Sequence, residues 1–263
     1  HVKQAGQRME LNSDIAAVVT GGASGLGAAV VEALRKAGVM VSLFDRDAEG
    51  GAHVARVTGS LFANVDVGDP SSVATGFAKA RAAHGQERIL IACAGIAPAE
   101  RTVTRNGAHD PAAFERVIRV NLLGVFNCAT QAAAGMAALE PANESGERGV
   151  IVNTASIAAY EGQIGQIAYS ASKAGVAGMT LPMARDLARY GIRVAAIAPG
   201  LFMTPMIAGF SEEIQEALKA KLEFPKRPGD PAEFAAMVLQ ICTNSMVNGE
   251  VIRLDGAYRM PPS

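Results

Sequence analysis

The stretch IAAVVTGGASGLGAAVVEALRK, residues 15–36, decides the fold. It begins with apolar and β-branched residues that predict a short buried strand. A glycine-rich segment follows from Gly21 to Gly27, and apolar residues then recur at helical spacing as far as Lys36. Gly38 predicts the end of that helix, because glycine readily adopts the left-handed conformation that terminates helices. The stretch therefore predicts a strand, a tight turn and a helix.

The same alternation continues along the rest of the chain. Asp69-Pro70 and Asp110-Pro111 predict helix starts, since aspartate caps a helix and proline suits its first turn. A long helix is expected over 169–190, where Pro182 predicts either a kink or an exposed upstream carbonyl. Further strands are expected at 39–44, 60–66, 89–92, 150–153, 193–198 and 251–254, with another helix at 231–243. The pattern predicts an α/β fold: a single Rossmann domain whose doubly wound parallel sheet has about seven strands flanked by helices.

Length and charge limit the classes of function. The chain of 263 residues suits one domain, which we expect over residues 9–263, with residues 1–8 a tag remnant or a disordered terminus. The net charge is −1 with acids and bases interspersed, so we expect neither a nucleic-acid nor a membrane partner. The apolar runs are too short for a bilayer and the N-terminus has no signal pattern. These features predict a cytoplasmic protein, or a mitochondrial-matrix protein in a eukaryote.

The cysteines and histidines do not suggest a metal site. The cysteines lie far apart in apolar stretches and predict buried free thiols rather than disulfides: Cys93, Cys128 and Cys242. The histidines within the expected domain lack the paired spacing of zinc ligands: His53, His84 and His109. We therefore expect no bound metal.

The glycine-rich turn predicts a nucleotide site. Gly21, Gly25 and Gly27 would let the backbone approach a pyrophosphate, and the helix that follows offers free N–H groups and a favourable dipole. Glycines also serve merely as tight turns. The position of this turn at the first strand-to-helix junction favours the nucleotide interpretation.

Asp45, at the end of the second expected strand, predicts which dinucleotide binds. Its carboxylate can accept hydrogen bonds from both hydroxyls of an adenosine ribose and would repel a 2′-phosphate, which favours NAD over NADP. The neighbouring Arg46 would attract a phosphate, so NADP remains an alternative. Asp66 ends the third expected strand, where it would either contact adenine or cap a turn.

Tyr169, Lys173 and Ser156 are the candidate reacting groups. Tyr169 and Lys173 are one helical turn apart and share a helix face. An ammonium stabilises a nearby phenolate, so we expect Lys173 to lower the pKa of Tyr169 and make it a general acid/base. Ser156 follows a strand in a loop where its hydroxyl would hold a substrate oxygen. Such Tyr–Lys pairs also occur on ordinary helix surfaces, but small residues here permit close approach of another body: Ser170, Ala171, Ser172, Ala174 and Gly175.

Together these motifs resemble the short-chain dehydrogenase/reductase family over residues 12–258. The resemblance is carried by 20–27, Asp66-Val67, Asn121, Ser156, Tyr-Ser-Ala-Ser-Lys at 169–173 and Pro199-Gly200. Longer segments resemble the type II 3-hydroxyacyl-coenzyme A dehydrogenases of that family: 153–156 with 160–163, 181–182 with 184–188, 198–202, 229–233 and 248–256. The loop 96–110 resembles an insertion of that group.

The resemblance implies roles for particular residues. Tyr169 would be the acid/base and Ser156 would orient the carbonyl. Lys173 would bind ribose and lower the pKa of Tyr169, and Asn121 would hold a water that links Lys173 to solvent. Further cofactor contacts are implied for Ser24, Leu26, Asp66, Val67, Gly95, Pro199, Gly200, Phe202 and Thr204. The substrate would be bordered by the loop 201–222 and by Gln163, Gln166, Leu201 and Met206.

The implied activity is NAD-dependent interconversion of a 3-hydroxyacyl-CoA and a 3-ketoacyl-CoA in fatty-acid metabolism, by a homotetramer. A dehydrogenase of steroids or other bulky secondary alcohols is an alternative, because apolar side chains around Leu201 would accept either substrate. An NAD-bound scaffold or interaction module is an alternative of another class. The complete set of reacting residues argues against that scaffold.

One position departs from the family pattern. The family usually has an asparagine before Ala-Gly at the end of the fourth strand, whereas this chain has Ala92-Cys93-Ala94-Gly95. That asparagine is understood to brace the sheet. We expect its loss to affect local rigidity and cofactor geometry rather than hydride transfer itself.

Overall fold

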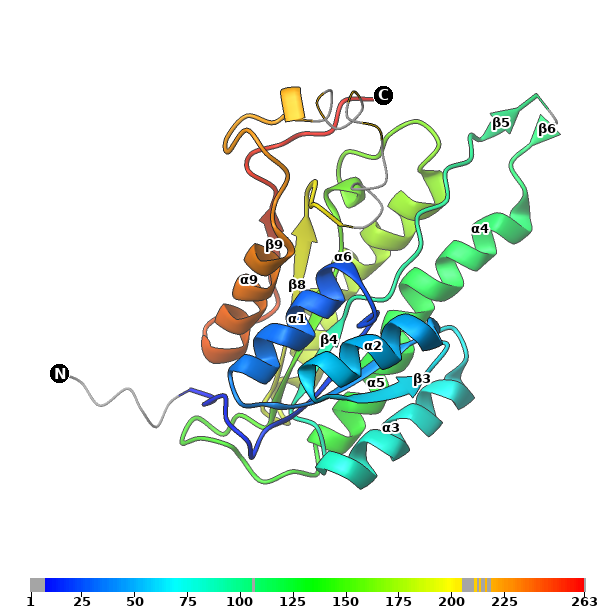
Figure 1. Cartoon of the computed structure of the whole chain (residues 1–263). Helices are drawn as coiled ribbons and strands as arrows, with labels where there is room; N and C mark the ends of the chain where they lie inside the picture. The colour runs from blue at the N-terminus through cyan, green and yellow to red at the C-terminus, as the bar shows by residue number, and fades with distance from the viewer. Residues whose placement is uncertain are drawn as a thin grey trace.

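A parallel sheet of seven strands forms the centre of the molecule (Figure 1). The structure, a computed structural model, describes residues 8–105, 107–204, 211, 213, 216 and 219–262. The strand order is β3-β2-β1-β4-β7-β8-β9, and each neighbouring pair is parallel. The strands are β1 (Ala16–Thr20), β2 (Met40–Asp45), β3 (Leu61–Asn64), β4 (Ile89–Ala92), β7 (Gly149–Thr154), β8 (Ile192–Pro199) and β9 (Val251–Leu254). The chain order reverses between β1 and β4, which is where open α/β sheets bind ligands.

Helices cover both faces of the sheet. One layer holds α1 (Gly25–Lys36), α2 (Ala48–Thr58) and α9 (Pro231–Thr243), and the other holds α3 (Pro70–His84), α4 (Pro111–Ile118), α5 (Gly124–Met136) and α6 (Ile167–Ala188) (Figure 1). A small antiparallel hairpin of β5 (Val103–Thr104) and β6 (Gly107–Ala108) projects from the body ahead of α4. The predicted doubly wound α/β fold is confirmed.

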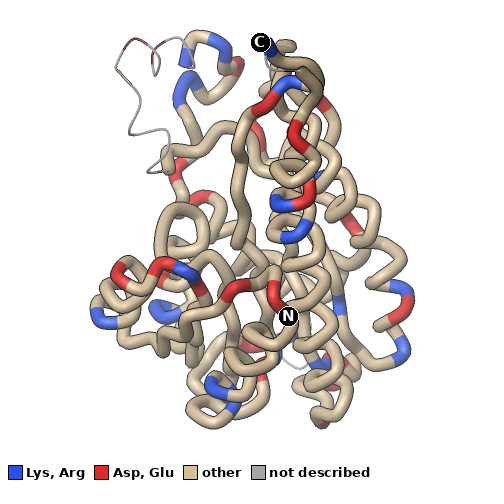
Figure 2. The backbone as a smooth tube through the Cα atoms, turned by 90° about the vertical axis from the view of Figure 1, so that its right-hand side faces the viewer, with Lys and Arg blue, Asp and Glu red and all other residues tan. Residues whose placement is uncertain are grey.

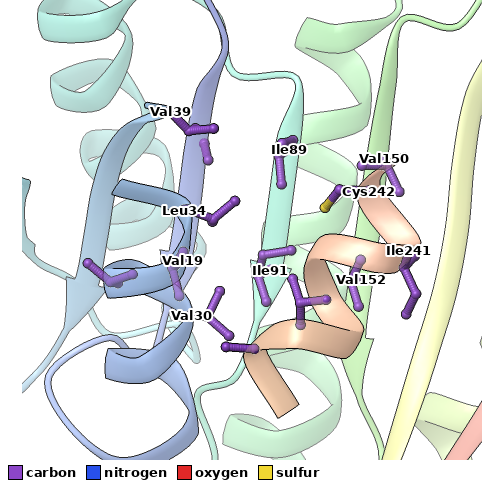
Figure 3. Packing of buried hydrophobic residues seen from close by; sticks show 14 of the residues in the cluster. Val19, Val30, Leu34, Val39, Ile89, Ile91, Val150, Val152, Ile241 and Cys242 are labelled. Carbon is purple, nitrogen blue, oxygen red and sulfur yellow. The ribbon is translucent and has the colours of Figure 1, made fainter. Parts of the chain in front are cut away.

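The core between the sheet and α1 and α9 consists of branched aliphatic side chains. Figure 3 shows this packing for Val19, Val30, Leu34, Ile89, Ile91, Val150, Val152, Ile241 and Cys242, all of them fully buried. The central strands β1, β4, β7 and β8 are buried on both faces, which explains their continuous apolar sequences. Cys128 is buried in the core on the opposite face, whereas Cys93 is only partly buried, and all three cysteines are free thiols.

The Asp-Pro pairs at 69–70 and 110–111 start helices as predicted, and a third such pair starts the expected helix over 231–243. Asp69, Asp110 and Asp230 each cap a helix whose first turn carries proline, and each accepts a hydrogen bond from a backbone N–H two residues on, at 2.8–3.0 Å. The expected long helix begins two residues earlier than predicted, at Ile167. Pro182 lies inside it. Gly178, four residues before Pro182, is exposed, so water can reach the carbonyl that loses its helical donor.

The charged residues are distributed over the surface with both signs interspersed, as Figure 2 shows along the described backbone. Among the described helices, none combines the length and the apolar character that crossing a bilayer requires. In the same part of the chain, His, Cys, Asp and Glu side chains form no group of three that could hold a metal ion.

Asn153 is a buried polar residue without a hydrogen-bond partner. It lies near the end of β7 and is fully buried, and neither its amide nitrogen nor its amide oxygen has a partner among the described residues. Its neighbours across the sheet are Ala92 on β4 and Ala196 on β8, which offer only methyl groups. Cys93, which stands where the family has asparagine, directly follows Ala92, so this unsatisfied amide lies one position away from the departure.

We expect Asn153→Leu to raise the free energy of unfolding by about 1 kcal/mol, because leucine has a similar volume and removes a buried unsatisfied polar group. Urea denaturation checks this. The matched control is Asn121→Leu: Asn121 is equally buried but makes three hydrogen bonds, so its loss should destabilise the fold by about 1–3 kcal/mol. A loss of stability in Asn153→Leu would show that the Asn153 amide has a partner, such as a bound water.

Candidate active site

The glycine-rich turn joins β1 to α1 at the point where the strand order reverses. Gly21 has φ +68°, and a Cβ there would lie 2.6 Å from the backbone nitrogen of Ala94, just after β4. A Cβ at Gly27 would collide with the carbonyl oxygen of Gly21. Only glycine allows these approaches, so the turn lies directly against the start of α1. The turn forms a cradle that side chains would fill.

The N-terminus of α1 is open to a ligand. Ser24 is its N-cap residue in an extended conformation, yet its side chain makes no capping hydrogen bond. The first N–H groups of a helix have no intrahelical partners and together with the helix dipole favour an anion. Gly25, with φ +54°, and Leu26 begin this helix. The turn therefore fits the pyrophosphate of a dinucleotide.

Asp45 lies beside this turn at the end of β2. Its carboxylate accepts hydrogen bonds from the backbone nitrogens of Ala23 and Asp47, each at 3.0 Å. The Arg46 guanidinium lies 3.8 Å from the carboxylate of Asp66. Asp66 also accepts from the backbone nitrogen of Gly68 at 2.9 Å, so it caps a turn, which is one of its two predicted roles.

The other predicted cofactor residues divide into two groups. The side chains of Val67 and Phe202 are buried: a Cβ on Gly124 would meet Val67, and Phe202 packs edge-on against Phe234 with ring centroids 6.2 Å apart. Their side chains belong to the core, so only their backbones are left for a cofactor. The second group lies near the carboxyl ends of β4 and β8 and consists of Gly95, Pro199, Gly200 and Thr204.

Ser156, Tyr169 and Lys173 come together as the sequence predicted. Tyr169 lies in the first turn of α6, and the Lys173 Nζ is 5.7 Å from the centroid of its ring. Ser156 follows β7 and its Oγ accepts a hydrogen bond from the backbone nitrogen of Ala158 at 3.1 Å. The Ser156 hydroxyl also hydrogen-bonds the Tyr169 side chain. Two hydroxyls and an ammonium thus meet at the carboxyl end of the sheet.

Burial dominates the electrostatics of this group. It raises the pKa of Tyr169, and the interaction with Ser156 offsets this only in part. The lowering of this pKa by Lys173 stays a prediction. Lys173 is itself buried, which lowers its own pKa to about 8, and its Nζ donates to the carbonyl oxygen of Thr154 at 2.7 Å. Desolvation therefore outweighs attraction here.

Cys93 stands beside these groups. Burial raises the pKa of its thiol to about 11, so the thiol is neutral at physiological pH. Its sulfur lies 3.5 Å from the Oγ1 of Thr154, which donates to it. Thr154 thus contacts Cys93 through its side chain and Lys173 through its carbonyl.

Asn121 braces the site. It lies in a π-helical turn, Arg119–Leu123, between α4 and α5. Its side chain accepts from the backbone nitrogen of Ile96 and donates to the carbonyl of Ile96, each at 2.8 Å, and also donates to the Ser172 Oγ at 3.1 Å. The side chain therefore ties the loop after β4 to α6. The water link from Asn121 to Lys173 stays a prediction.

Two of the predicted substrate residues, Gln163 and Gln166, lie in the loop before α6, and Leu201 lies in an apolar cluster next to that loop. The Gln163 Nε2 donates to the carbonyl of Pro261 at 3.1 Å, and the Gln166 Oε1 accepts from the Gln163 backbone nitrogen at 3.0 Å. Leu201 packs with an apolar cluster of Ile157, Leu222, Tyr258 and Met260. Met206 lies outside the described residues.

Sequence reasoning missed the C-terminal segment, residues 256–262. Tyr258 is buried in the apolar cluster around Leu201, and the carbonyl of Pro262 accepts from the backbone nitrogen of Ile164 at 2.9 Å. The only sequence signal was a pair of apolar residues, Tyr258 and Met260, after the last strand. The contact with a loop almost a hundred positions earlier has no local pattern.

Comparison with known proteins agrees with this geometry. The profile of the short chain dehydrogenase family matches residues 15–215. The 3-hydroxyacyl-CoA dehydrogenase type-2 of Homo sapiens is 48% identical over 252 residues, which cover 94% of this chain and 96% of that protein. The protein of the same name from Drosophila melanogaster is 49% identical over 249 residues, with 93% and 97% covered. A crystal structure of 3-hydroxyacyl-CoA dehydrogenase type-2 from Mycobacterium avium superposes with a TM-score of 0.91 at 42% identity, covering 97% of this chain and 99% of that one.

The buried ammonium of Lys173 should make stability depend on pH. Between pH 8 and 10.5 the folded Lys173 loses its proton while an unfolded lysine keeps it, so the unfolded state binds more protons and stability rises with pH. We expect the free energy of unfolding of the wild type, relative to Lys173→Met, to rise by up to about 1.4 kcal/mol per pH unit in this window and to be level below it.

Urea denaturation at several pH values measures this difference. Lys36→Met is the control, because the Lys36 side chain is 74% exposed and should show no such trend. Parallel pH curves for the wild type and Lys173→Met would show that the pKa of Lys173 is not lowered by the fold.

Proposed function

The chain belongs to the short-chain dehydrogenase family, and from that membership we propose that it interconverts a 3-hydroxyacyl-CoA and a 3-ketoacyl-CoA with NAD as the hydride carrier. Members of this family are oxidoreductases that use a nicotinamide cofactor, and the chain is one of them. The observation that carries the proposal is the convergence of Ser156, Tyr169 and Lys173 beside the glycine-rich turn. The acyl-CoA substrate is supported by the names of the relatives with 48% and 49% identity.

The proton in this reaction is moved by Tyr169. In the oxidation its phenolate accepts the proton of the substrate hydroxyl, and in the reduction its phenol donates a proton to the carbonyl oxygen. Burial favours the phenol, which is the form that reduction requires. The Ser156 Oγ accepts from the backbone nitrogen of Ala158, so the Ser156 hydroxyl hydrogen would turn from Tyr169 to the substrate oxygen when substrate is bound.

The nicotinamide cofactor supplies the hydride acceptor or donor when it is bound. Its pyrophosphate would be held by the turn Gly21–Gly27, its adenosine ribose by Asp45 and its nicotinamide ribose by Lys173. The choice of NAD is supported by the Asp45 carboxylate, which two backbone N–H groups hold beside the turn. Arg46 lies near Asp66, which weakens the case for a 2′-phosphate.

The assembly and compartment are further parts of the proposal. Apolar side chains on α5, on α6 and at the end of the π-helical turn before α5 are partly exposed, which supports pairing of copies through these helices into a homotetramer: Phe126, Ile167, Leu181 and Leu123. The three free cysteines favour a reducing compartment such as the cytoplasm. The interspersed surface charges favour neither a nucleic-acid nor a membrane partner.

Acetoacetyl-CoA should be reduced with NADH, followed at the absorbance of NADH. Tyr169→Phe should lower kcat by about 10²–10⁴, because it removes the proton donor, while NADH binding and the circular dichroism spectrum are retained. Tyr190→Phe is the control, since that tyrosine lies beyond the far end of α6. If the protein reduces steroids or other ketones but not acetoacetyl-CoA, the acyl-CoA assignment is overturned. No turnover of any ketone would favour an NAD-bound scaffold.

Asp45→Ser should move the ratio of kcat/KM for NADPH to that for NADH upward by about tenfold or more, because a carboxylate that repels the 2′-phosphate is removed. Initial rates with both cofactors measure this ratio. Glu49→Gln, also a carboxylate near this turn at the start of α2, is the control and should leave the ratio unchanged. The NAD assignment fails if the wild type prefers NADPH or if Asp45→Ser does not move the ratio.

A further inference from the structure

Arg253 joins the end of β9 and the C-terminal segment to the loop before α6, which lies about ninety residues earlier in the sequence. From β9 its guanidinium makes a bidentate pair with the carboxylate of Glu161, at 2.7 and 2.8 Å, and its Nε donates to the Asp255 Oδ2 at 2.7 Å. Its Nη2 also donates to the carbonyl of Tyr258 at 3.3 Å, and its Cζ lies 5.2 Å from the ring centroid of Tyr160. All three guanidinium nitrogens are therefore engaged.

The geometry points to Arg253 as a positioning residue that holds the C-terminal segment, residues 256–262, as one wall of the substrate site. This inference rests on the proposed acyl-CoA activity and adds a residue that sets which acyl chains are accepted. Arg253 need not touch the substrate, because its contacts act on the loop before α6 and on the C-terminal segment.

The first step of the argument is the attachment of the two segments to each other. The loop 161–166 precedes Tyr169, and its Gln163 and Ile164 donate to the carbonyls of Pro261 and Pro262. On its other side the carbonyl of Gly165 accepts from the backbone nitrogen of Glu100 at 2.9 Å. The loop thus lies between the C-terminal segment and the segment around Glu100 that leads into the hairpin. Its position determines where Gln163 and Gln166 lie.

The second step is the apolar surface that this attachment creates. Tyr258 is 5% exposed and clusters with Ile157 and Leu222, which are also buried, and Met260 packs at the margin. Ile157 directly follows Ser156, the residue proposed to hold the substrate oxygen. Leu201 and Met260 are the partly exposed members of this cluster, so they would present an apolar wall close to Ser156 that suits the alkyl part of an acyl chain.

The third step is that the ion pair between Arg253 and Glu161, rather than apolar packing alone, holds the C-terminal segment in place. The Arg253 and Glu161 side chains are only 23% and 28% exposed, so their bidentate bonds are partly shielded from water. The Glu161 carboxylate has a lowered pKa, first because of its hydrogen bonds with Arg253. Arg259 reaches the same two carboxylates but is 56% exposed, so its contribution is small.

The test compares Arg253→Met with Arg259→Met in the full-length protein. Methionine keeps an unbranched apolar stem and removes every donor. We expect Arg253→Met to raise KM for a 3-ketoacyl-CoA of ten carbons by about tenfold and for acetoacetyl-CoA by less than about threefold, with kcat and the Kd of NADH nearly unchanged. Arg259→Met should leave all four quantities unchanged. Glu161→Gln should reproduce the effect, and the double variant with Arg253→Met should be no worse than the single one.

Hydrogen exchange of the same proteins gives a readout that does not depend on activity. Backbone amides of residues 161–166 and 257–260 should exchange faster in Arg253→Met than in the wild type, and not in Arg259→Met. If Arg253→Met does not fold, Glu161→Gln carries both measurements, because that side chain is partly exposed. An unchanged KM ratio between long and short acyl chains, or unchanged exchange in these two segments, would overturn the inference.

The outcome is distinguishable from failure of the proposed function. If the wild type reduces some other ketone but no acyl-CoA, the substrate assignment fails while the exchange measurement still decides the role of Arg253. If the wild type reduces acyl-CoA and the two variants behave alike, the inference about Arg253 fails and the proposed function stands.

Discussion

The close contact between the glycine-rich turn and the end of β4 is the constraint on which the site depends. Gly21 approaches the backbone of Ala94 so closely that no other residue fits, and Gly27 holds α1 directly against the turn. This contact lies where the strand order reverses between β1 and β4. Because all seven strands are parallel, their carboxyl ends lie along the same edge of the sheet, and so do the residues that follow them.

Burial at that edge shifts the pKa values of Tyr169 and Lys173. Removing Lys173 and Tyr169 from water favours their neutral forms, which raises the pKa of the phenol and lowers that of the ammonium.

Polar bracing around the site is unequal. Asn121 satisfies its amide through Ile96 and Ser172 and links the loop after β4 to α6. Asn153, on the adjacent strand, faces Ala92 and has no partner among the described residues. The departure at Cys93 therefore leaves the loop after β4 held by Asn121, while the adjacent strand β7 carries the unsatisfied amide of Asn153.

The sequence by itself determined the parallel sheet, the capped helices and the positions of Tyr169, Lys173 and Ser156, because these follow from local periodicity, glycine and proline placement and one-turn spacing. Only the tertiary structure decided the pKa of Tyr169, the burial of the Val67 and Phe202 side chains and the unsatisfied amide of Asn153. It also decided that Arg253 meets Glu161. Those features depend on desolvation and on contacts between residues distant in the chain, and neither leaves a local pattern in the sequence.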